Sequence, residues 1–322
     1  MQERIVFFPL AVSIILLGSC SINRMAIQAV SNALTGEGSS TVFTGEEDPE
    51  LVAKALPFAI KMYESLLAAN PRHEGLILTT GSLLVMYANA FVQGPAQILP
   101  RNQYAERDRQ YVRAKKLYLR GGAILYSGLD KKYPGFSAAQ GPDQLAGYLG
   151  KMNKADVPFL YWTAAGFLSA YSLNPFDLEL GRKVPELLAY IDRAYALDPD
   201  FNQGALDEFY LLFYASMPEG MGGNKSLVDA YFRQAREKSG DRSPGPYIAY
   251  AEAVCIPAQD YTTFKGYLEI ALAMDPDADP ANRLVTILSQ RKARYLLEEA
   301  GNFFLDAESD MDWDDVIQEV PN

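Results

Sequence analysis

The sequence predicts an all-α protein built from repeated pairs of helices, and three observations support this fold class. The same helix ending recurs along the chain. Asp-Pro and Asn-Pro dipeptides follow several apolar segments, and proline ends helices because it lacks an N–H group and restricts the residue before it. No segment shows the sustained alternation of apolar and polar residues that is typical of a half-buried strand.

The recurring ending has the form Ala-x-Ala-[Leu/Met]-Asp-Pro. Its two clear copies place Asp198 and Asp275 77 residues apart (275 − 198). A degraded copy carries Ala235, which lies 36 residues before Ala271 (271 − 235) and 41 after Ala194 (235 − 194). The ending resembles the second helix of a tetratricopeptide repeat, where a small residue lets paired helices approach closely. The sequence therefore predicts tetratricopeptide-like helix pairs packed into a compact superhelical repeat domain.

The first twenty residues predict an exported lipoprotein. Arg4 precedes an apolar run from Ile5 to Leu17, which is short for a membrane-spanning helix and typical of a signal peptide. The run ends in Leu-Gly-Ser-Cys, which resembles a bacterial lipobox, so residues 1–19 would be removed and Cys20 acylated, with palmitate for example. An ordinary signal peptide with an incidental cysteine is the alternative. The chain has only two cysteines, and this rarity favours the lipoprotein.

The rest of the chain is expected to form three parts. Residues 20–47 would comprise the lipidated N-terminus, a short helix and a tether rich in glycine, serine and threonine. Residues 48–300 would form the helical repeat domain. Residues 301–322 form an acidic tail, which either stays solvated or docks as a short helix through Trp313.

Capping residues, prolines and glycines place the helices of the repeat domain in order. Asp48-Pro49 opens the first one, because aspartate caps helix N-termini and proline fits the first turn. A short helix is expected from Pro142 within a looser stretch, 135–150. The other helices are expected at 48–69, 74–93, 101–129, 156–174, 182–197, 203–216, 225–238, 245–255, 260–274 and 280–300.

Charge is unevenly distributed along this acidic chain. The net charge is −11, residues 306–319 contain seven acids, and no lysine or arginine follows Arg294, which argues against a nucleic-acid partner. One helix differs, because four cations recur there at intervals of three and four: Arg109, Arg113, Lys116 and Arg120. We call these four residues the basic stripe. The stripe is either a solvated face or a docking site for an acidic partner or for the protein's own acidic tail.

Residue patterns typical of catalysis or metal binding are missing. His73 is the single histidine, and the Gly-x-Ser-x-Gly motif of many serine hydrolases does not occur. The segment 222–226 resembles a phosphate-binding loop but has asparagine where glycine is needed. The segment that starts at Asp275 resembles a calcium loop but lacks its glycine and its final acid. We therefore expect no enzymatic activity, no metal and no cofactor, and we expect Cys255 to be a buried apolar residue.

Aromatic residues are abundant, with 20 tyrosines, 16 phenylalanines and two tryptophans. Tyrosine combines a ring for packing with a hydroxyl group for hydrogen bonding, which suits concave binding surfaces. For any single aromatic residue, packing in the core is the alternative. The candidates for a ligand cleft are Phe159, Tyr161, Trp162, Phe209, Phe213 and Tyr247.

Four segments, taken together, resemble one protein family. They are Asp-Val-Pro-Phe-Leu-Tyr-Trp-Thr-Ala-Ala at 156–165, Gly-Ala-Leu-Asp-Glu-Phe at 204–209, the stretch 243–260 with its Ala-Glu-Ala-Val-Cys-Ile-Pro-Ala-Gln-Asp, and Asp-Pro-Asp-Ala-Asp-Pro-Ala-Asn-Arg-Leu at 275–284. This set resembles the TatT family, the tetratricopeptide-repeat lipoproteins associated with tripartite ATP-independent periplasmic (TRAP) transporters. The turn Ser-Pro-Gly-Pro-Tyr at 243–247 is longer than the family's Ser-Pro-Tyr.

The resemblance implies a lipid-anchored protein at the periplasmic face of a bacterial membrane, forming a homotrimer whose protomers each have a pore or cleft. It also implies that the protein binds the transporter's periplasmic solute-binding protein and assists uptake of a small organic ligand, apolar or amphipathic in character. Two hypotheses follow. The protein is an interaction module that docks the solute-binding protein, or it is a lipoprotein that carries an apolar ligand in its own aromatic cleft.

Overall fold

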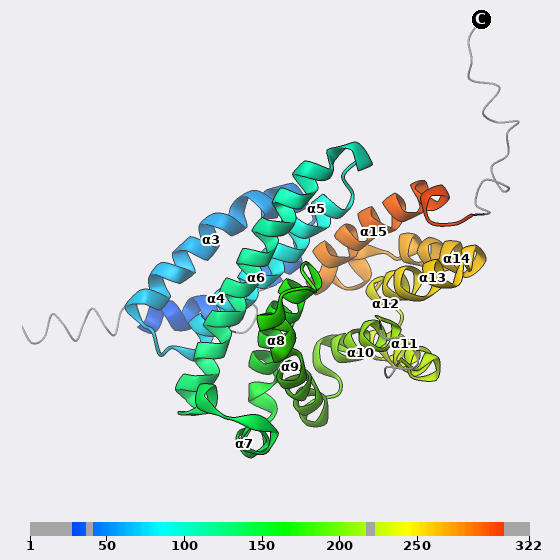
Figure 1. Ribbon diagram of the computed structural model, residues 1–322. Helices are drawn as coiled ribbons and strands as arrows, with labels where there is room; N and C mark the ends of the chain where they lie inside the picture. Colours follow the sequence, from blue (N-terminus) through cyan, green and yellow to red (C-terminus); the bar gives the residue numbers. More distant parts are fainter. Residues whose placement is uncertain (1–27, 37–40, 217–222, 306–322) are drawn as a thin grey trace, which may run out of the picture.

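The structure is a computed structural model that describes residues 28–36, 41–216 and 223–305. Helices and turns account for this part of the chain, and it contains no strand. The expected all-α fold of packed helix pairs is therefore confirmed (Figure 1). Cys20, the expected signal peptide and residues 306–322 of the acidic tail lie outside the described residues.

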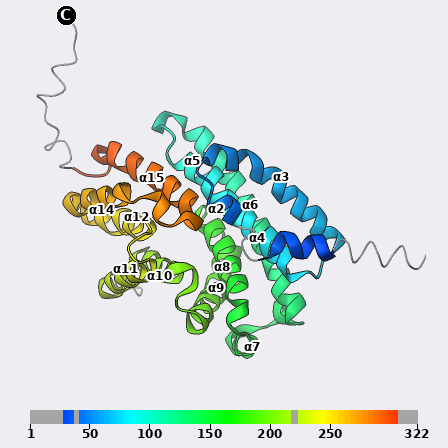
Figure 2. The same ribbon diagram turned by 180° about the vertical axis from the view of Figure 1, so that it is seen from behind.

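The first half of the domain is a row of long helices. They are α3 (Pro49–Ala69), α4 (Glu74–Ala88), α6 (Tyr104–Lys132), α8 (Val157–Ser172) and α9 (Leu178–Leu197). Each packs against the next in the order α3, α4, α6, α8 and α9 (Figures 1 and 2). One short helix, α7 (Gly141–Leu149), precedes α8, as the sequence predicts.

Glycines permit the close contact between α4 and α6. A Cβ atom on Gly121 would lie 2.7 Å from the carbonyl oxygen of Gly81, a distance that real Cβ contacts do not reach. A similarly close approach occurs on the other side of α6, where a Cβ on Gly166 of α8 would lie 3.1 Å from the Cα of Gly122, which is tighter than most real Cβ contacts. These residues let the backbones of three helices approach closely, which buries the central helix α6 along much of its length.

The second half consists of shorter helices. They are α10 (Ala205–Ser216), α11 (Lys225–Ser239), α12 (Gly245–Tyr250), α14 (Tyr261–Ala273) and α15 (Arg283–Glu298). The pairs α10–α11, α12–α14 and α14–α15 are in contact, and α10 also contacts α12. The small residues of the recurring ending, Ala194 and Ala271, are both fully buried, as the repeat interpretation predicts.

The last long helix returns to the beginning of the domain. Helix α15 contacts both α3 and α2 (Thr41–Thr44). Arg291 of α15 pairs with Glu50 of α3 at 2.6 Å, and the Arg283 guanidinium donates to the carbonyl oxygen of Gly45 at 3.4 Å. The superhelix is therefore compact, because its two ends touch (Figure 2).

The N-terminal segment is more firmly attached than a tether would be. Residues 28–35 are helical, in agreement with the expected short helix. The Tyr63 hydroxyl donates to the carbonyl oxygen of Leu34 at 2.8 Å, and His73 Nε2 lies 2.8 Å from Asn32 Oδ1. Residues 41–45 form α2 and a turn, and α2 contacts α15. A segment with polar residues and glycine can still form a helical turn where it packs against another helix.

Two prolines fail to end their helices where the sequence predicts. Helix α4 continues through a π-helical turn, Asn89–Gln93, into α5 (Gly94–Gln97), so the expected end at Gly94-Pro95 is wrong. The Gly94 N–H donates to the carbonyl oxygen of Asn89, five residues earlier. Pro95 then falls in the first turn of a new α-helical segment, where its missing N–H is tolerated. A second π-helical turn, Ala251–Cys255, precedes α13 (Ile256–Ala258) in the same way.

The interior contains two hydrophobic cores. The larger one is formed by α3 to α9 together with Leu206 and Tyr210 of α10. The smaller one is formed by α11 to α15 together with Leu211 of α10. Cys255 is buried in the smaller core, as expected. The stretch Glu74–Gln97 is long and apolar enough to cross a membrane, but most of it is buried in the larger core. Helix α10 therefore joins the two cores.

Candidate functional site

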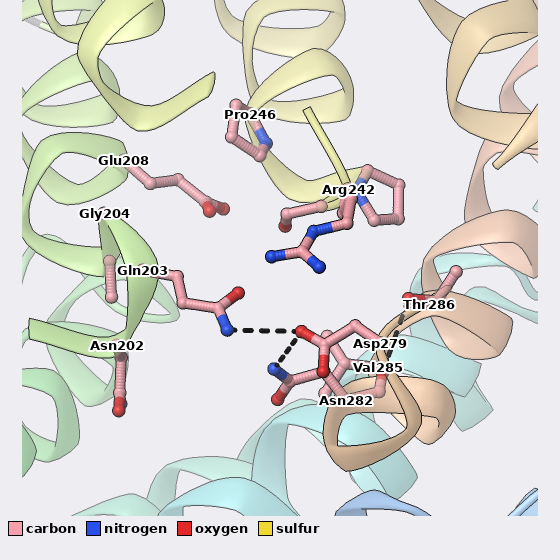
Figure 3. A pocket seen from close by; sticks show the side chains of 13 residues that line it. Asn202, Gln203, Gly204, Glu208, Arg242, Pro246, Asp279, Asn282, Val285 and Thr286 are labelled. Atoms are coloured by element: carbon pink, nitrogen blue, oxygen red, sulfur yellow. Dashed lines mark hydrogen bonds between the residues drawn. The ribbon is translucent and has the colours of Figure 1, made fainter. Parts of the chain in front are cut away.

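A small pocket lies where α10, the loop before α12 and the start of α15 meet. Its volume is about 150 Å³. Glu208, Arg242, Asp279 and Asn282 are among its lining side chains, and Figure 3 shows them from close by. Most of its lining residues have polar side chains, and we therefore call it the polar pocket, although apolar atoms line it as well. It lies beside the helix that joins the two cores.

An unusual turn positions α10 at this pocket. Three successive residues have left-handed backbone conformations: Asn202 with φ 46°, Gln203 with φ 57° and Gly204 with φ 99°. A Cβ on Gly204 would also lie 3.0 Å from the Cα of Ala235, so glycine fits best there. Left-handed conformations at non-glycine residues cost free energy, and such strain often accompanies functional sites. The turn aims the first turn of α10, and with it Glu208, into the pocket.

Glu208 is a carboxylate without a partner. It is half-buried and makes no hydrogen bond or ion pair with any residue that the structure describes. Burial raises the pKa of its carboxyl group to about 6, against a smaller opposing effect of the positive charge on Lys292. Its Oε2 atom lies so close to the backbone of Gly245 that a Cβ there would approach it to 2.7 Å.

The neighbouring Asp207 shows how an acid in α10 is normally compensated. It is fully buried, accepts a bond from Lys238 Nζ at 2.7 Å, and accepts another from the Tyr195 hydroxyl at 3.0 Å. Buried charges are usually paired in this manner, since an unpaired one costs several kcal/mol. Against this comparison, the lone carboxylate of Glu208 stands out as a group that is free to bind something else.

Arg242 is the matching cation on the other side of the pocket. Its guanidinium makes one contact, a 3.5 Å hydrogen bond from Nε to the carbonyl oxygen of Ser239, and no ion pair within the described residues. Figure 3 shows the Glu208 carboxylate and the Arg242 guanidinium approaching the space from different segments of the chain. Below them, Asp279 accepts hydrogen bonds from Gln203 at 3.2 Å and Asn282 at 2.9 Å. The arrangement offers two carboxylates, those of Glu208 and Asp279, and one cationic group to a small polar molecule.

Catalytic and metal chemistry find little support in the described residues. They contain no group of three histidine, cysteine, aspartate or glutamate side chains that could hold a metal ion. The thiol of Cys255 is buried, and burial raises its pKa to about 12, which makes it a poor nucleophile.

The structure divides the six predicted cleft residues between separate environments. Phe159 belongs to the larger core, where it packs against Gly128 of α6. Tyr247 belongs to the smaller core, stacks edge-on with Phe232, and donates from its hydroxyl to Asp241 at 2.9 Å. These two side chains therefore have evident packing roles, which was the alternative that the sequence left open.

The other four lie in two aromatic groups. Tyr161 and Trp162 of α8 are in contact, with ring centroids 5.1 Å apart, and Phe201 packs on Tyr161 at 5.2 Å. Phe209 and Phe213 stack on one another along α10 at 6.1 Å. None of the six predicted residues lines the polar pocket. Burial raises the pKa of the Tyr161 hydroxyl, and the charge on Glu208 adds to this effect, so the first group lies near the pocket.

The basic stripe follows one face of α6, but its four cations are not equivalent. Arg109 pairs with Glu106 and Arg120 pairs with Glu64. Arg113 donates to the Tyr87 hydroxyl at 3.1 Å and lies over the ring of that tyrosine. Lys116 is exposed and has no partner among the described residues. Only Arg113 and Lys116 therefore lack a neutralising acid.

An apolar side chain extends the face that carries the stripe. Val112, with 57% of its surface exposed, lies between Arg109 and Lys116 at helical spacing. Lys115 lies on a different face of α6, about 140° around the helix from the stripe, and its 2.8 Å ion pair with Asp177 holds the loop before α9 there. Phe176 of that loop and Leu178, the first residue of α9, are 91% and 74% exposed. Exposed apolar groups next to cations are common at protein interfaces.

Glu208 and Arg242 were not among the site residues predicted from the sequence. A weak signal was present, because Glu208 is an acid within the largely apolar segment Leu206–Tyr210. However, Asp207 beside it gives the same signal, and only its contact with Lys238 shows that Asp207 is the structural one. Arg242 lies in a loop, where an arginine carries no pattern at all.

Comparison with known proteins gives two findings. A family model described as TRAP transporter T-component matches residues 45–304 of the chain. An uncharacterized protein of Treponema pallidum (strain Nichols) is 38% identical over 309 residues, which cover 91% of this chain and 96% of that protein.

Proposed function

Because this chain belongs to the family of TRAP transporter T-components, we propose that it binds the transporter's periplasmic solute-binding protein and assists uptake of a small organic ligand. The family match over residues 45–304 is the observation that carries this proposal, since it spans almost the whole helical domain. A transporter-associated role also agrees with a chain in which no catalytic motif is visible.

The anchor and the assembly belong to the same proposal. We propose that acylated Cys20 holds the protein at the periplasmic face of a bacterial membrane and that three copies form a homotrimer. A lipid anchor would keep the domain close to the transporter without a membrane-spanning helix. Intact mass of the membrane-extracted protein tests the acylation, and light scattering of the soluble form tests the trimer.

The face of α6 that carries the basic stripe is our candidate for the docking surface. It combines two cations without acidic partners, Arg113 and Lys116, with the exposed side chain of Val112. Cations speed association with an acidic surface, and a buried apolar centre supplies affinity. Arg109 and Arg120 are expected to contribute less, because each is already paired within the chain.

A capture experiment tests this proposal. The soluble form that begins after Cys20 is immobilised, and periplasmic extract is passed over it, followed by the purified solute-binding protein. We expect saturable capture of that protein. Arg113→Glu with Lys116→Glu should weaken capture about tenfold or more. Reversal of Lys265, an exposed cation on α14, is the matched control and should have no effect. If a purified solute-binding protein never binds at low salt, the docking function is refuted.

The polar pocket favours a second candidate function, in which the protein itself holds a ligand. Glu208 and Arg242 are unpaired charges that face a space of about 150 Å³, the size of a small ring compound. This pocket suits a ligand with polar ends better than a wholly apolar one. Native mass spectrometry of the purified protein, compared with Arg242→Ala, tests the idea. A bound molecule that is lost in the variant supports it, and an empty protein in both cases opposes it.

A further inference from the structure

A second and larger cavity lies between the beginning of α6 and the last helix, α15. Its volume is about 560 Å³, and it is open to solvent on one side. Three of its lining residues are cations, Arg101, Arg107 and Lys292. Much of the rest is apolar or aromatic, with Ile98 and Tyr111 on one wall and Phe303 at the end of the chain's described part. We call this cavity the amphipathic groove.

The groove has more positive than negative charge. Lys292 is neutralised by Glu252, at 2.6 Å. Arg101 makes one contact, a 3.5 Å hydrogen bond to the carbonyl oxygen of Asn302, and the only ionic neighbour of Arg107 within the described residues is Asp108, at 3.9 Å. Two arginines therefore line a partly apolar groove without a close acidic partner. An occupant that suits this lining carries carboxylates beside an apolar or aromatic group.

The described chain ends at the rim of this groove, and Gln259 holds it there. The Gln259 side chain donates from Nε2 to the carbonyl oxygen of Phe303 at 2.9 Å. Its Oε1 accepts from the N–H of Leu305 at 3.1 Å. One amide thus binds the backbone of a short segment through two hydrogen bonds and fixes the point from which residues 306–322 continue.

A second glutamine, Gln97, lines the groove, and its segment is similar in sequence to the segment that contains Gln259. The segments Val92-Gln93-Gly94-Pro95-Ala96-Gln97 and Val254-Cys255-Ile256-Pro257-Ala258-Gln259 share the pattern Val-x-x-Pro-Ala-Gln, 162 residues apart (259 − 97). The first two residues of each segment end a π-helical turn. Gln97 lines the groove and makes no hydrogen bond within the described residues. The two backbones differ, since Gln259 has φ 55° whereas Gln97 ends α5, but both present an amide where a helix stops.

We propose that residues 306–322 of the acidic tail bind back into the amphipathic groove of the same chain. These residues carry seven acids and no cation, and they include Trp313. Acidic side chains near Leu305 would face Arg101 and Arg107, the amide of Gln97 would bind the peptide backbone, and Trp313 would cover the apolar wall.

Length and charge both favour this occupant over a separate protein. Trp313 lies eight residues beyond Leu305 (313 − 305), a stretch that can reach about 26–29 Å when extended. Phe303 of the same chain already forms part of the groove, so the tail begins where it would bind. A tethered segment has an effective concentration in the millimolar range, which lets a weak contact become populated.

Spin labelling of the full soluble chain tests the proposal. Ser309→Cys places a single reactive thiol in the tail of the form that begins after Cys20, because Cys255 is buried with a pKa of about 12 and stays unmodified. We expect a restricted spectrum at low salt. Arg101→Glu with Arg107→Glu should lower the ratio of bound to free label about tenfold, since two attractions become repulsions. Trp313→Ala should lower it as well.

Matched variants on the basic stripe separate this groove from the other cationic surface. Arg113→Glu with Lys116→Glu changes charge equally but should leave the spectrum unchanged. A freely tumbling label in the parent chain overturns the proposal. A restricted label that is released only by the stripe variant also overturns it, because the tail would then lie on α6. Labelled chains with the groove arginines reversed are then mixed with an excess of unlabelled parent chains, whose groove is intact. This must not restore restriction, and a restored signal would assign the binding to the groove of a neighbouring copy.

Discussion

Replacing Glu208 with glutamine should stabilise the protein in a manner that depends on pH. The ordinary pKa of the group is 4.5, and burial raises it to about 6 in the folded chain. A carboxyl group with a raised pKa is tolerated best when protonated. Its cost is therefore absent below pH 4.5, grows as the pH rises through the window from 4.5 to 6, and is fully present above it.

The expected magnitude follows from the two pKa values. Their difference of about 1.5 corresponds to about 2 kcal/mol at 1.36 kcal/mol per pH unit. Glu208 keeps some contact with solvent, so we expect about 1–2 kcal/mol, which is about 2–6 °C in Tm at pH 8 for a domain of this size. Glu208→Gln should therefore melt higher than the parent at pH 8 and at the same temperature at pH 4.5.

Thermal unfolding followed by circular dichroism measures this difference. Glu269→Gln, which removes an exposed acid on α14, is the control and should change Tm equally little at both pH values. The reasoning fails if Glu208→Gln leaves Tm unchanged at pH 8, or if it raises Tm by the same amount at pH 4.5. Either result would mean that the Glu208 carboxylate is adequately solvated or paired in solution.

Three further predictions concern packing and burial. Asp207→Asn should lower the free energy of unfolding by about 3–5 kcal/mol in urea titrations, because it leaves the Lys238 cation without its buried partner. Gly121→Ala should cost about 1–3 kcal/mol through the clash between α4 and α6, whereas Gly147→Ala, with open space around the new methyl group, should be neutral or stabilising. Cys255 should react with iodoacetamide at pH 8 only after unfolding, as mass spectrometry would show, and rapid labelling of the folded chain would contradict its burial.

Local sequence signals placed most helices correctly. Asp48 caps α3 with hydrogen bonds to the N–H groups of Glu50 and Leu51, as the Asp-Pro pattern predicts. Such signals act within a few residues, so they can be recognised without knowing the fold. The helix ends expected before Pro95 and Pro257 were wrong. In both places a π-helical turn precedes the proline and lets the helix continue, and no local sequence pattern predicts such a turn.

The aromatic residues show where composition stops being informative. Burial of a ring lowers the free energy wherever the ring packs, so Phe159 in the core of α4 to α8 and Tyr161 near Glu208 look alike in the sequence. The basic stripe was recognisable from its spacing. Its pairing was not, because Glu64 and Arg120 are 56 residues apart (120 − 64) and meet only when α3 and α6 both pack against α4.

The sequence by itself determined the all-α fold, the helix pairs and the family, because periodicity, capping and motif order depend on neighbouring residues. The lipid anchor stays a prediction from the lipobox. Only the tertiary structure decided which charges are compensated. Asp207 and Glu208 are adjacent in the chain, yet one meets Lys238 and the other meets an empty space. Desolvation and pairing depend on residues brought from distant segments, and those distances exist only in the folded chain.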